Sequence, residues 1–190
     1  MSNSINPIPT LYKNYYFRSR AEARWAVFFD ALDIKYLYEP EGFELNDGTR
    51  YLPDFYLPES DTFFEVKGIM TDKDMHKIES LISDLNKPCC IGYSDMTFNS
   101  CNNMWNEYYY LAKKEASVLV RCSECGKYYF AGLDGSFECK CCGAYDGDHY
   151  FDTRASGDHC YWLEDEVLDA IKKANQARFE YGEKCNNLKE

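Results

Sequence analysis

Residues 51–67 read YLPDFYLPESDTFFEVK, two apolar runs joined by the four residues Pro58-Glu59-Ser60-Asp61. A loop of this length between two runs rich in aromatic residues is typical of a β-hairpin. We therefore expect strands over 51–57 and 62–67, paired so that Asp54 lies directly opposite Glu65. Because side chains alternate between the two faces of a strand, one face of this hairpin is a core face. That face is predicted to carry Tyr51, Phe55, Leu57, Phe64 and Val66.

The opposite face of the hairpin gathers three charged residues, Asp54, Glu65 and Lys67. Side chains that face each other on paired strands have Cβ atoms only about 5 Å apart, and two like charges there are destabilising. A cation held between Asp54 and Glu65 would remove this repulsion. The alternative interpretation is an ordinary hairpin with a surface salt bridge between Glu65 and Lys67.

The motif consists of Pro53-Asp54, a gap of ten residues, and Glu65-Val66-Lys67, and it resembles the PD-(D/E)XK nuclease superfamily. This is the fold of many restriction, repair and phage endonucleases. The resemblance implies an α/β core of mixed α+β type, in which Asp54 and Glu65 hold Mg²⁺ or Mn²⁺. It also implies that Lys67 orients the attacking water or stabilises the developing charge. The implied function is a Mg²⁺-dependent DNA endonuclease of phage or mobile-element type.

A helix is expected just upstream, over residues 20–33, because Trp25, Ala26, Phe29 and Leu32 follow at helical spacing. Ser19 is a suitable N-cap, and Glu22 three residues later would complete a capping box. Glu22 also lies on the apolar stripe expected to face the sheet, where many members of the superfamily place a carboxylate beside the metal. Both roles of Glu22 stay open at this point.

Three basic residues, Arg18, Arg20 and Arg24, lie at the start of this helix and are candidate contacts to nucleic-acid phosphates. A solvated helix end is the alternative interpretation. The net charge of −11 argues against a protein that grips nucleic acid over a large surface. Residues 1–50, however, hold six basic and seven acidic residues and are close to balance. Nucleic acid, most simply DNA, therefore remains the predicted partner.

The order of predicted elements also fits the superfamily. A strand over 35–45 and an Asn46-Asp47-Gly48 turn precede the hairpin, and a helix over 71–85 and a strand over 88–93 follow it. The sequence of helix, three strands, helix and strand is the minimal core of the superfamily, which predicts a nuclease-like core over residues 1–95. The polar segment 94–103 is the expected boundary. We expect a segment containing a zinc ribbon over 96–162 and a C-terminal helix, packed on the core, within 163–190.

Two CxxCG knuckles, Cys122–Gly126 and Cys139–Gly143, define the second segment. Thiolates from two such knuckles can surround Zn²⁺ tetrahedrally with no open position, which predicts a structural zinc site resembling a zinc ribbon. The predicted ligands are Cys122, Cys125, Cys139 and Cys142. Cys141 lies inside the second knuckle and could replace Cys139 or Cys142. His149 and His159 are further alternative ligands.

The composition sets outer limits on the function. Hydrophobic residues make up 45% of the chain and aromatic residues 17%, as in a folded globule. No segment approaches the roughly 18 uninterrupted apolar residues of a membrane helix, and the N-terminus shows no signal pattern, so we expect a cytoplasmic protein of a bacterial or phage-infected cell. Residues 177–183 resemble the ending of small phage-encoded proteins. Two alternatives to a nuclease are an inhibitor that retains the fold and a docking protein that uses the ribbon. A homodimer or a protein partner is left open.

Overall fold

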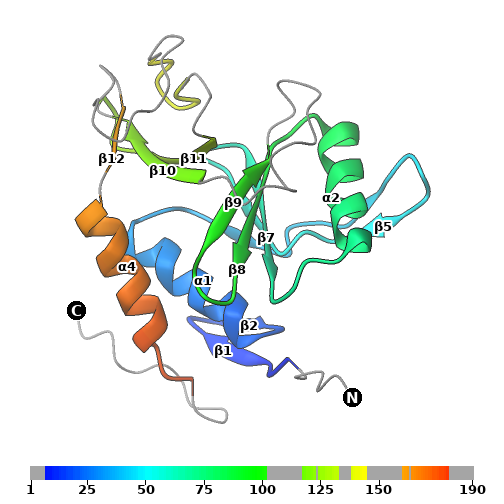
Figure 1. Cartoon of the computed structure of the whole chain (residues 1–190), viewed down its shortest axis with the longest axis horizontal. Helices are drawn as coiled ribbons and strands as arrows, with labels where there is room; N and C mark the ends of the chain where they lie inside the picture. The colour runs from blue at the N-terminus through cyan, green and yellow to red at the C-terminus, as the bar shows by residue number, and fades with distance from the viewer. Residues whose placement is uncertain are drawn as a thin grey trace.

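The computed structural model describes residues 7–101, 117–122, 124–132, 138–144, 160–162 and 164–179. Within these residues the fold is mixed α+β (Figure 1). A five-stranded sheet lies at its centre, in the order β3-β6-β7-β8-β9. Its strands are β3 (Leu37–Tyr38), β6 (Phe55–Leu57), β7 (Thr62–Lys67), β8 (Cys89–Tyr93) and β9 (Phe98–Cys101).

Smaller sheets and three described helices surround this centre (Figure 1). Two short hairpins are formed by β1 (Thr10–Tyr12) with β2 (Tyr15–Phe17) and by β4 (Phe43–Glu44) with β5 (Arg50–Tyr51). A three-stranded sheet has the order β11-β10-β12, with β10 (Ser117–Cys122), β11 (Tyr128–Gly132) and β12 (Cys160–Trp162). The helices are α1 (Arg20–Ala31), α2 (Asp72–Leu85) and α4 (Glu164–Gln176).

The motif hairpin forms with the register predicted from its loop length. Leu57 pairs with Thr62 and Phe55 with Phe64, so Asp54, one residue before β6, comes opposite Glu65. β7 then pairs in parallel with β8 through the crossover helix α2, as parallel neighbours require. The side chains of Thr71 and Asp74 form a capping box that begins α2, and Asn86 with φ 50° ends it. The predicted helix over 71–85 and strand over 88–93 are thus present with nearly the expected bounds.

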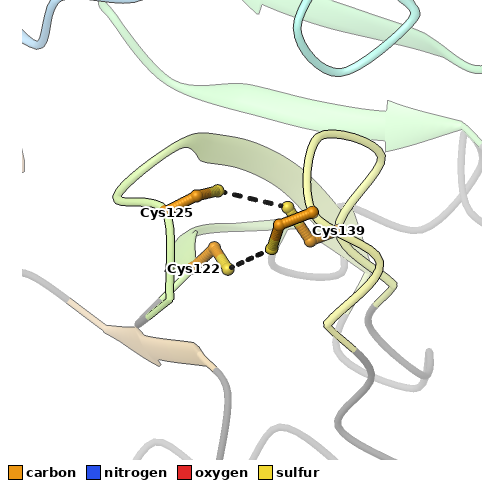
Figure 2. A group of neighbouring side chains, drawn as sticks. Cys122, Cys125 and Cys139 are labelled. Carbon is orange, nitrogen blue, oxygen red and sulfur yellow. Dashed lines mark hydrogen bonds between the residues drawn. The ribbon is translucent and has the colours of Figure 1, made fainter.

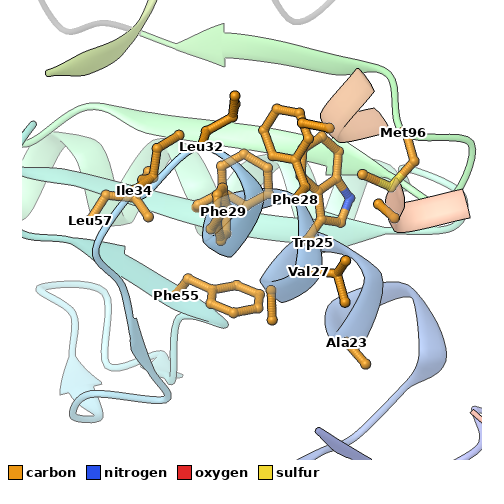
Figure 3. Close-up of a cluster of buried hydrophobic side chains, with 14 of the residues drawn as sticks. Ala23, Trp25, Val27, Phe28, Phe29, Leu32, Ile34, Phe55, Leu57 and Met96 are labelled. Carbon is orange, nitrogen blue, oxygen red and sulfur yellow. The ribbon is translucent and has the colours of Figure 1, made fainter. Parts of the chain in front are cut away.

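The two faces of the central sheet are both covered, by different helices (Figure 1). α1 and α4 pack on one face, over an aromatic cluster that includes Trp25, Phe29 and Phe55 (Figure 3). Phe64 belongs to the same cluster. α2 covers the other face with a second buried cluster, formed by Leu45, Phe63, Ile78, Leu81, Ile82, Cys89 and Ile91. The carboxylate-bearing face of the hairpin is therefore a second core face.

Two predicted strands are broken by local backbone chemistry. The strand expected over 35–45 is divided into β3 and β4, because Glu39 adopts a left-handed φ of 44° just before Pro40. The strand expected over 51–57 is divided into β5 and β6 at Pro53, which has no N–H to donate to a ladder. As a consequence Tyr51, predicted on the face of Phe55, packs instead with the cluster under α2.

The described parts of the later segments pack on the same core as the first half. Leu119 and Phe130 of the three-stranded sheet and Ala170 and Ala174 of α4 belong to the cluster that contains Phe64. β9 lies within the polar segment 94–103 and continues the central sheet by pairing with β8. Helix α4, within the predicted range 163–190, ends at Gln176, and Phe179 beyond it packs with its ring centroid 6.2 Å from that of Tyr12.

One glycine is required by the packing beneath the site. A Cβ atom added to Gly92 in β8 would lie 2.5 Å from ring carbons of both Phe64 and Trp25. Both rings are fully buried, so neither can move aside.

None of the described helices is long and apolar enough to cross a membrane.

Candidate functional site

Asp54, Glu65 and Lys67 meet at the open end of the motif hairpin. The backbone N–H of Asp54 donates to Oε1 of Glu65 (3.0 Å), and the backbone N–H of Val66 donates to Oδ2 of Asp54 (2.8 Å). Lys67 donates through Nζ to Oε2 of Glu65 (2.8 Å). Asp54 is 4% exposed and Glu65 only 1%, so this is a buried group of charges and not a surface salt bridge.

Burial dominates the electrostatics of this group. Desolvation, and then the neighbouring charge of Glu65, raise the pKa of Asp54 far above the ordinary value of a carboxylic acid, against the opposing effects of Lys67 and the Val66 N–H. Burial alone would lower the pKa of Lys67, but Glu65 and Asp54 outweigh it and raise this pKa. Two buried carboxylates repel each other when both are ionised, and burying them is costly unless a cation neutralises them. Such a pair therefore favours the binding of an added cation.

Arg18 supplies one cation from outside the motif. Its Nη2 donates to Oδ1 of Asp54 and its Nε lies 2.7 Å from Oε1 of Glu39. Although partial burial acts in the opposite direction, Asp54 and Glu39 help to raise the pKa of Arg18 above its usual range. The predicted phosphate contact is thus already paired with carboxylates of the same chain.

Glu22 lies in the first turn of α1, 7% exposed, and is linked to the group through Arg18 and Tyr38. Its Oε2 accepts from the Tyr38 hydroxyl (2.7 Å) and from the backbone N–H of Arg18 (3.0 Å), and its Oε1 accepts from the Ser19 hydroxyl (2.7 Å). Ser19 caps the helix as predicted, but the N–H bound by Glu22 belongs to Arg18 and not to Ser19, so the expected reciprocal capping box is displaced by one residue.

Glu22 does not join Asp54 and Glu65 in a three-carboxylate cluster. Among the described residues, the cysteine group below is the only set of three or more potential ligand atoms close enough to hold one ion. Arg20 and Arg24 are partly buried, and the Nε of each makes no hydrogen bond within the described part of the chain.

The sequence gives no indication that two tyrosines, Tyr38 and Tyr51, lie beside the carboxylates of this site. The hydroxyl of Tyr38 donates to Glu22 and accepts from the N–H of Arg18 (2.9 Å), and burial followed by the bond to Glu22 raises its pKa. Tyr51 lies on the other side, with its hydroxyl beside Glu65. Neither tyrosine belongs to a recognisable motif, and each comes to the carboxylates only through tertiary packing.

The second candidate site is formed by the two knuckles (Figure 2). The Sγ atoms of Cys122, Cys125, Cys139 and Cys142 all lie within 4.8 Å of one another, an arrangement that could hold a metal ion and fits a zinc ribbon. In each knuckle the glycine N–H donates to the carbonyl of the first cysteine at 2.8 Å. Gly126 and Gly143 have φ of 73° and 74°, the left-handed conformation for which the CxxCG pattern needs glycine.

The structure separates Cys141 from this set. Its side chain is exposed, and its Sγ lies 3.5 Å from the backbone carbonyl oxygen of Glu59. Although burial opposes the shift, hydrogen bonds, first among them the one between the Tyr129 hydroxyl oxygen and the Cys139 Sγ (3.1 Å), lower the pKa of Cys139 to about 6. His149 and His159, the alternative ligands, lie outside the described residues.

The knuckles contact the loop of the motif hairpin. Lys127 forms an ion pair with the carboxylate of Glu59, and the Tyr129 hydroxyl donates to the backbone carbonyl of Glu59 (3.3 Å). On the other side of the ribbon, Phe130 packs on Phe64 with ring centroids 5.3 Å apart. The segment that carries the knuckles thus contacts the strand pair that carries Asp54 and Glu65.

Comparisons with family models, with curated proteins and with solved structures find no match to this chain.

Proposed function

We propose that this protein is a divalent-metal-dependent nuclease whose active site is formed by Asp54, Glu65 and Lys67. The supporting observation is the face-to-face placement of two nearly inaccessible carboxylates with a lysine paired to one of them. Such a pair is costly to bury unless a cation neutralises it. The motif likeness to the PD-(D/E)XK superfamily favours the same conclusion, with DNA as the substrate.

The balance of charge around the pair supports a divalent ion. Four carboxylates, those of Glu22, Glu39, Asp54 and Glu65, face two cations, Arg18 and Lys67. The remaining deficit is that of one divalent cation when all four acids are ionised. Oxygen ligands of this kind suit Mg²⁺ or Mn²⁺.

Each residue has a distinct role in this proposal. Asp54 and Glu65 would hold the ion, which supplies an activated water and stabilises charge on the phosphate. Lys67, fixed by Glu65, would orient that water or offset charge on the phosphate oxygens as it develops. Arg20 and Arg24 would contact the phosphate backbone.

The four knuckle cysteines are proposed to hold zinc in a structural role. The set is complete, with four thiols and no position left for a reacting water. Elemental analysis of protein purified without chelator tests this part, and one zinc per chain is the expected result.

Cleavage assays test the nuclease directly. The protein is incubated with supercoiled plasmid, linear duplex, single-stranded DNA and RNA, each with Mg²⁺, Mn²⁺ or no divalent ion. Asp54→Asn and Glu65→Gln are expected to lose cleavage at least a hundredfold. Asp33→Asn, a carboxylate whose side chain is 81% exposed and paired only with Lys35 in the described residues, should cleave like the wild type.

One observation favours the alternative of a non-catalytic inhibitor or docking protein. Asp54 is already paired with Arg18, so it is partly neutralised without a metal. Absence of cleavage on all four substrates, or cleavage unchanged in both site variants, would overturn the nuclease and favour this alternative.

A further inference from the structure

Tyr51 is fixed at the edge of the carboxylate group by its ring. It ends β5, lies opposite Phe43 in the β4–β5 hairpin, and packs against the buried cluster under α2. Nζ of Lys77, from α2, lies 5.9 Å from the centroid of the Tyr51 ring, a distance typical of a cation–π contact. Contacts on several sides thus leave the ring little freedom to move.

The hydroxyl of this ring is buried and unsatisfied. It lies beside the carboxylate of Glu65, yet it makes no hydrogen bond of good geometry within the described residues. A tyrosine hydroxyl carries its proton at neutral pH, so this group is available as a hydrogen-bond donor. A buried donor without a partner costs about 1–3 kcal/mol, which a phenylalanine at this position would avoid.

Glu65 has acceptor capacity left for this donor. Its Oε1 accepts from the Asp54 N–H and its Oε2 from Lys67, whereas an ionised carboxylate has about four acceptor sites. An ion held between Asp54 and Glu65 would use one of the remaining sites. Metal-ligating carboxylates are commonly held in orientation by a hydrogen bond from a neighbouring side chain, and loss of that partner weakens metal binding.

We propose that Tyr51 is a positioning residue for Glu65, whose hydroxyl donates to the Glu65 carboxylate when a divalent cation is bound and fixes its oxygens toward the ion. This inference rests on the metal site of the proposed function. It explains why a polar group is buried at a place that needs only an apolar ring for packing. It also assigns a role to a residue that lies outside the Asp-Glu-Lys motif.

Tyr51→Phe tests the inference because it removes only the hydroxyl. Binding of Mn²⁺ to zinc-loaded protein is measured by electron paramagnetic resonance of the free ion, for the wild type, Tyr51→Phe and Glu65→Gln. Tyr36→Phe is the matched control, since Tyr36 is partly buried against Phe29 and Phe55 and is influenced by Asp30 and Tyr15 but not by Glu65. Tyr51→Phe should bind Mn²⁺ about 10- to 100-fold more weakly, and its melting temperature without divalent ions should equal or exceed that of the wild type.

The outcomes separate this inference from the proposed function. If the wild type binds Mn²⁺ in a manner that Glu65→Gln abolishes, and Tyr51→Phe binds equally well, the role of Tyr51 is overturned while the metal site stands. A loss in Tyr51→Phe that Tyr36→Phe reproduces also overturns it, because the effect is then not specific to Glu65. If the wild type shows no binding that depends on Glu65, the proposed metal site itself fails.

Discussion

Replacing Asp54 by asparagine should stabilise the protein at alkaline pH in the absence of Mg²⁺. Burial, and then the charge of Glu65, raise the pKa of Asp54 from 3.8 to about 7. An acid whose pKa is raised by folding binds its proton more tightly in the folded chain, so folding stability is lost as the pH rises from about 4 to about 7. The asparagine variant cannot lose a proton at this position and should escape that loss.

The expected size of the effect follows from the same values. A tenfold difference in proton affinity is worth about 1.4 kcal/mol, so the full difference corresponds to at most about 4 kcal/mol. Asparagine retains an oxygen for the Val66 N–H but gives up the ion pair with half-exposed Arg18, which is worth about 1 kcal/mol. A net gain of about 2–3 kcal/mol at pH 8 raises the melting temperature by roughly 5–10 °C for a chain of this size.

Thermal unfolding followed by circular dichroism measures this gain between pH 5 and pH 8.5, in buffer stripped of divalent ions without adding a chelator. The difference between variant and wild type is the relevant quantity, because protonation of the cysteine site affects both proteins equally. Asp33→Asn serves as the control: loss of its exposed pair with Lys35 should change the stability only slightly, and by the same amount at every pH in this range. Addition of Mg²⁺ at pH 8 should stabilise the wild type but not Asp54→Asn. The reasoning is refuted if Asp54→Asn is less stable than the wild type at pH 8, or if the difference does not grow with pH.

Three further outcomes are expected. Gly92→Ala should cost more than about 3 kcal/mol or prevent soluble expression, because the added methyl collides with buried rings of Phe64 and Trp25, and a denaturant titration that found less than 1 kcal/mol would contradict the packing. Cys139→Ser should lose the bound zinc in elemental analysis while Cys141→Ser keeps it, and equal zinc contents in the two variants would contradict the ligand set. Lys67→Met should lower the stability without divalent ions by about 3–5 kcal/mol, because it leaves Glu65 buried with its main cation removed, and Mg²⁺ should recover part of the loss. Unchanged stability in a denaturant titration would contradict a buried ion pair between Lys67 and Glu65.

The parts of the site foreseen from the sequence are those controlled by short-range chemistry. The four-residue loop sets the hairpin register, and the register alone places Asp54 opposite Glu65. The two CxxCG knuckles likewise determine their own turns, since the glycines must adopt positive φ wherever the ribbon lies in the fold. Ser19 and Thr71 mark the starts of α1 and α2 for the same local reason.

The parts that were missed depend on contacts between distant segments. In an unbroken strand the side chains of Tyr51 and Phe55 would lie on the same face of the sheet. Because the strand is interrupted at Pro53, the alternation does not continue across it, and Tyr51 packs against the cluster under α2. Arg18 looks like a free phosphate contact in the sequence, yet folding brings it to Asp54, 36 residues later in the chain. No pattern in the first half of the sequence predicts that Glu59 forms an ion pair with Lys127 of the ribbon, 68 residues away.

This last contact gives the ribbon a physical role in the site at the other end of the hairpin. Glu59 lies in the loop that fixes the pairing of β6 and β7, and it is held by Lys127 through its carboxylate and by Tyr129 through its backbone. A slip of one residue in that pairing would turn Asp54 and Glu65 to opposite faces of the sheet and destroy the carboxylate pair. The Tyr129 hydroxyl also contacts the Sγ of Cys139, so this side chain links the conformation of the loop directly to that of the cysteine cluster. A metal bound by the four thiolates would therefore stabilise not only the ribbon but also the register on which the proposed active site depends.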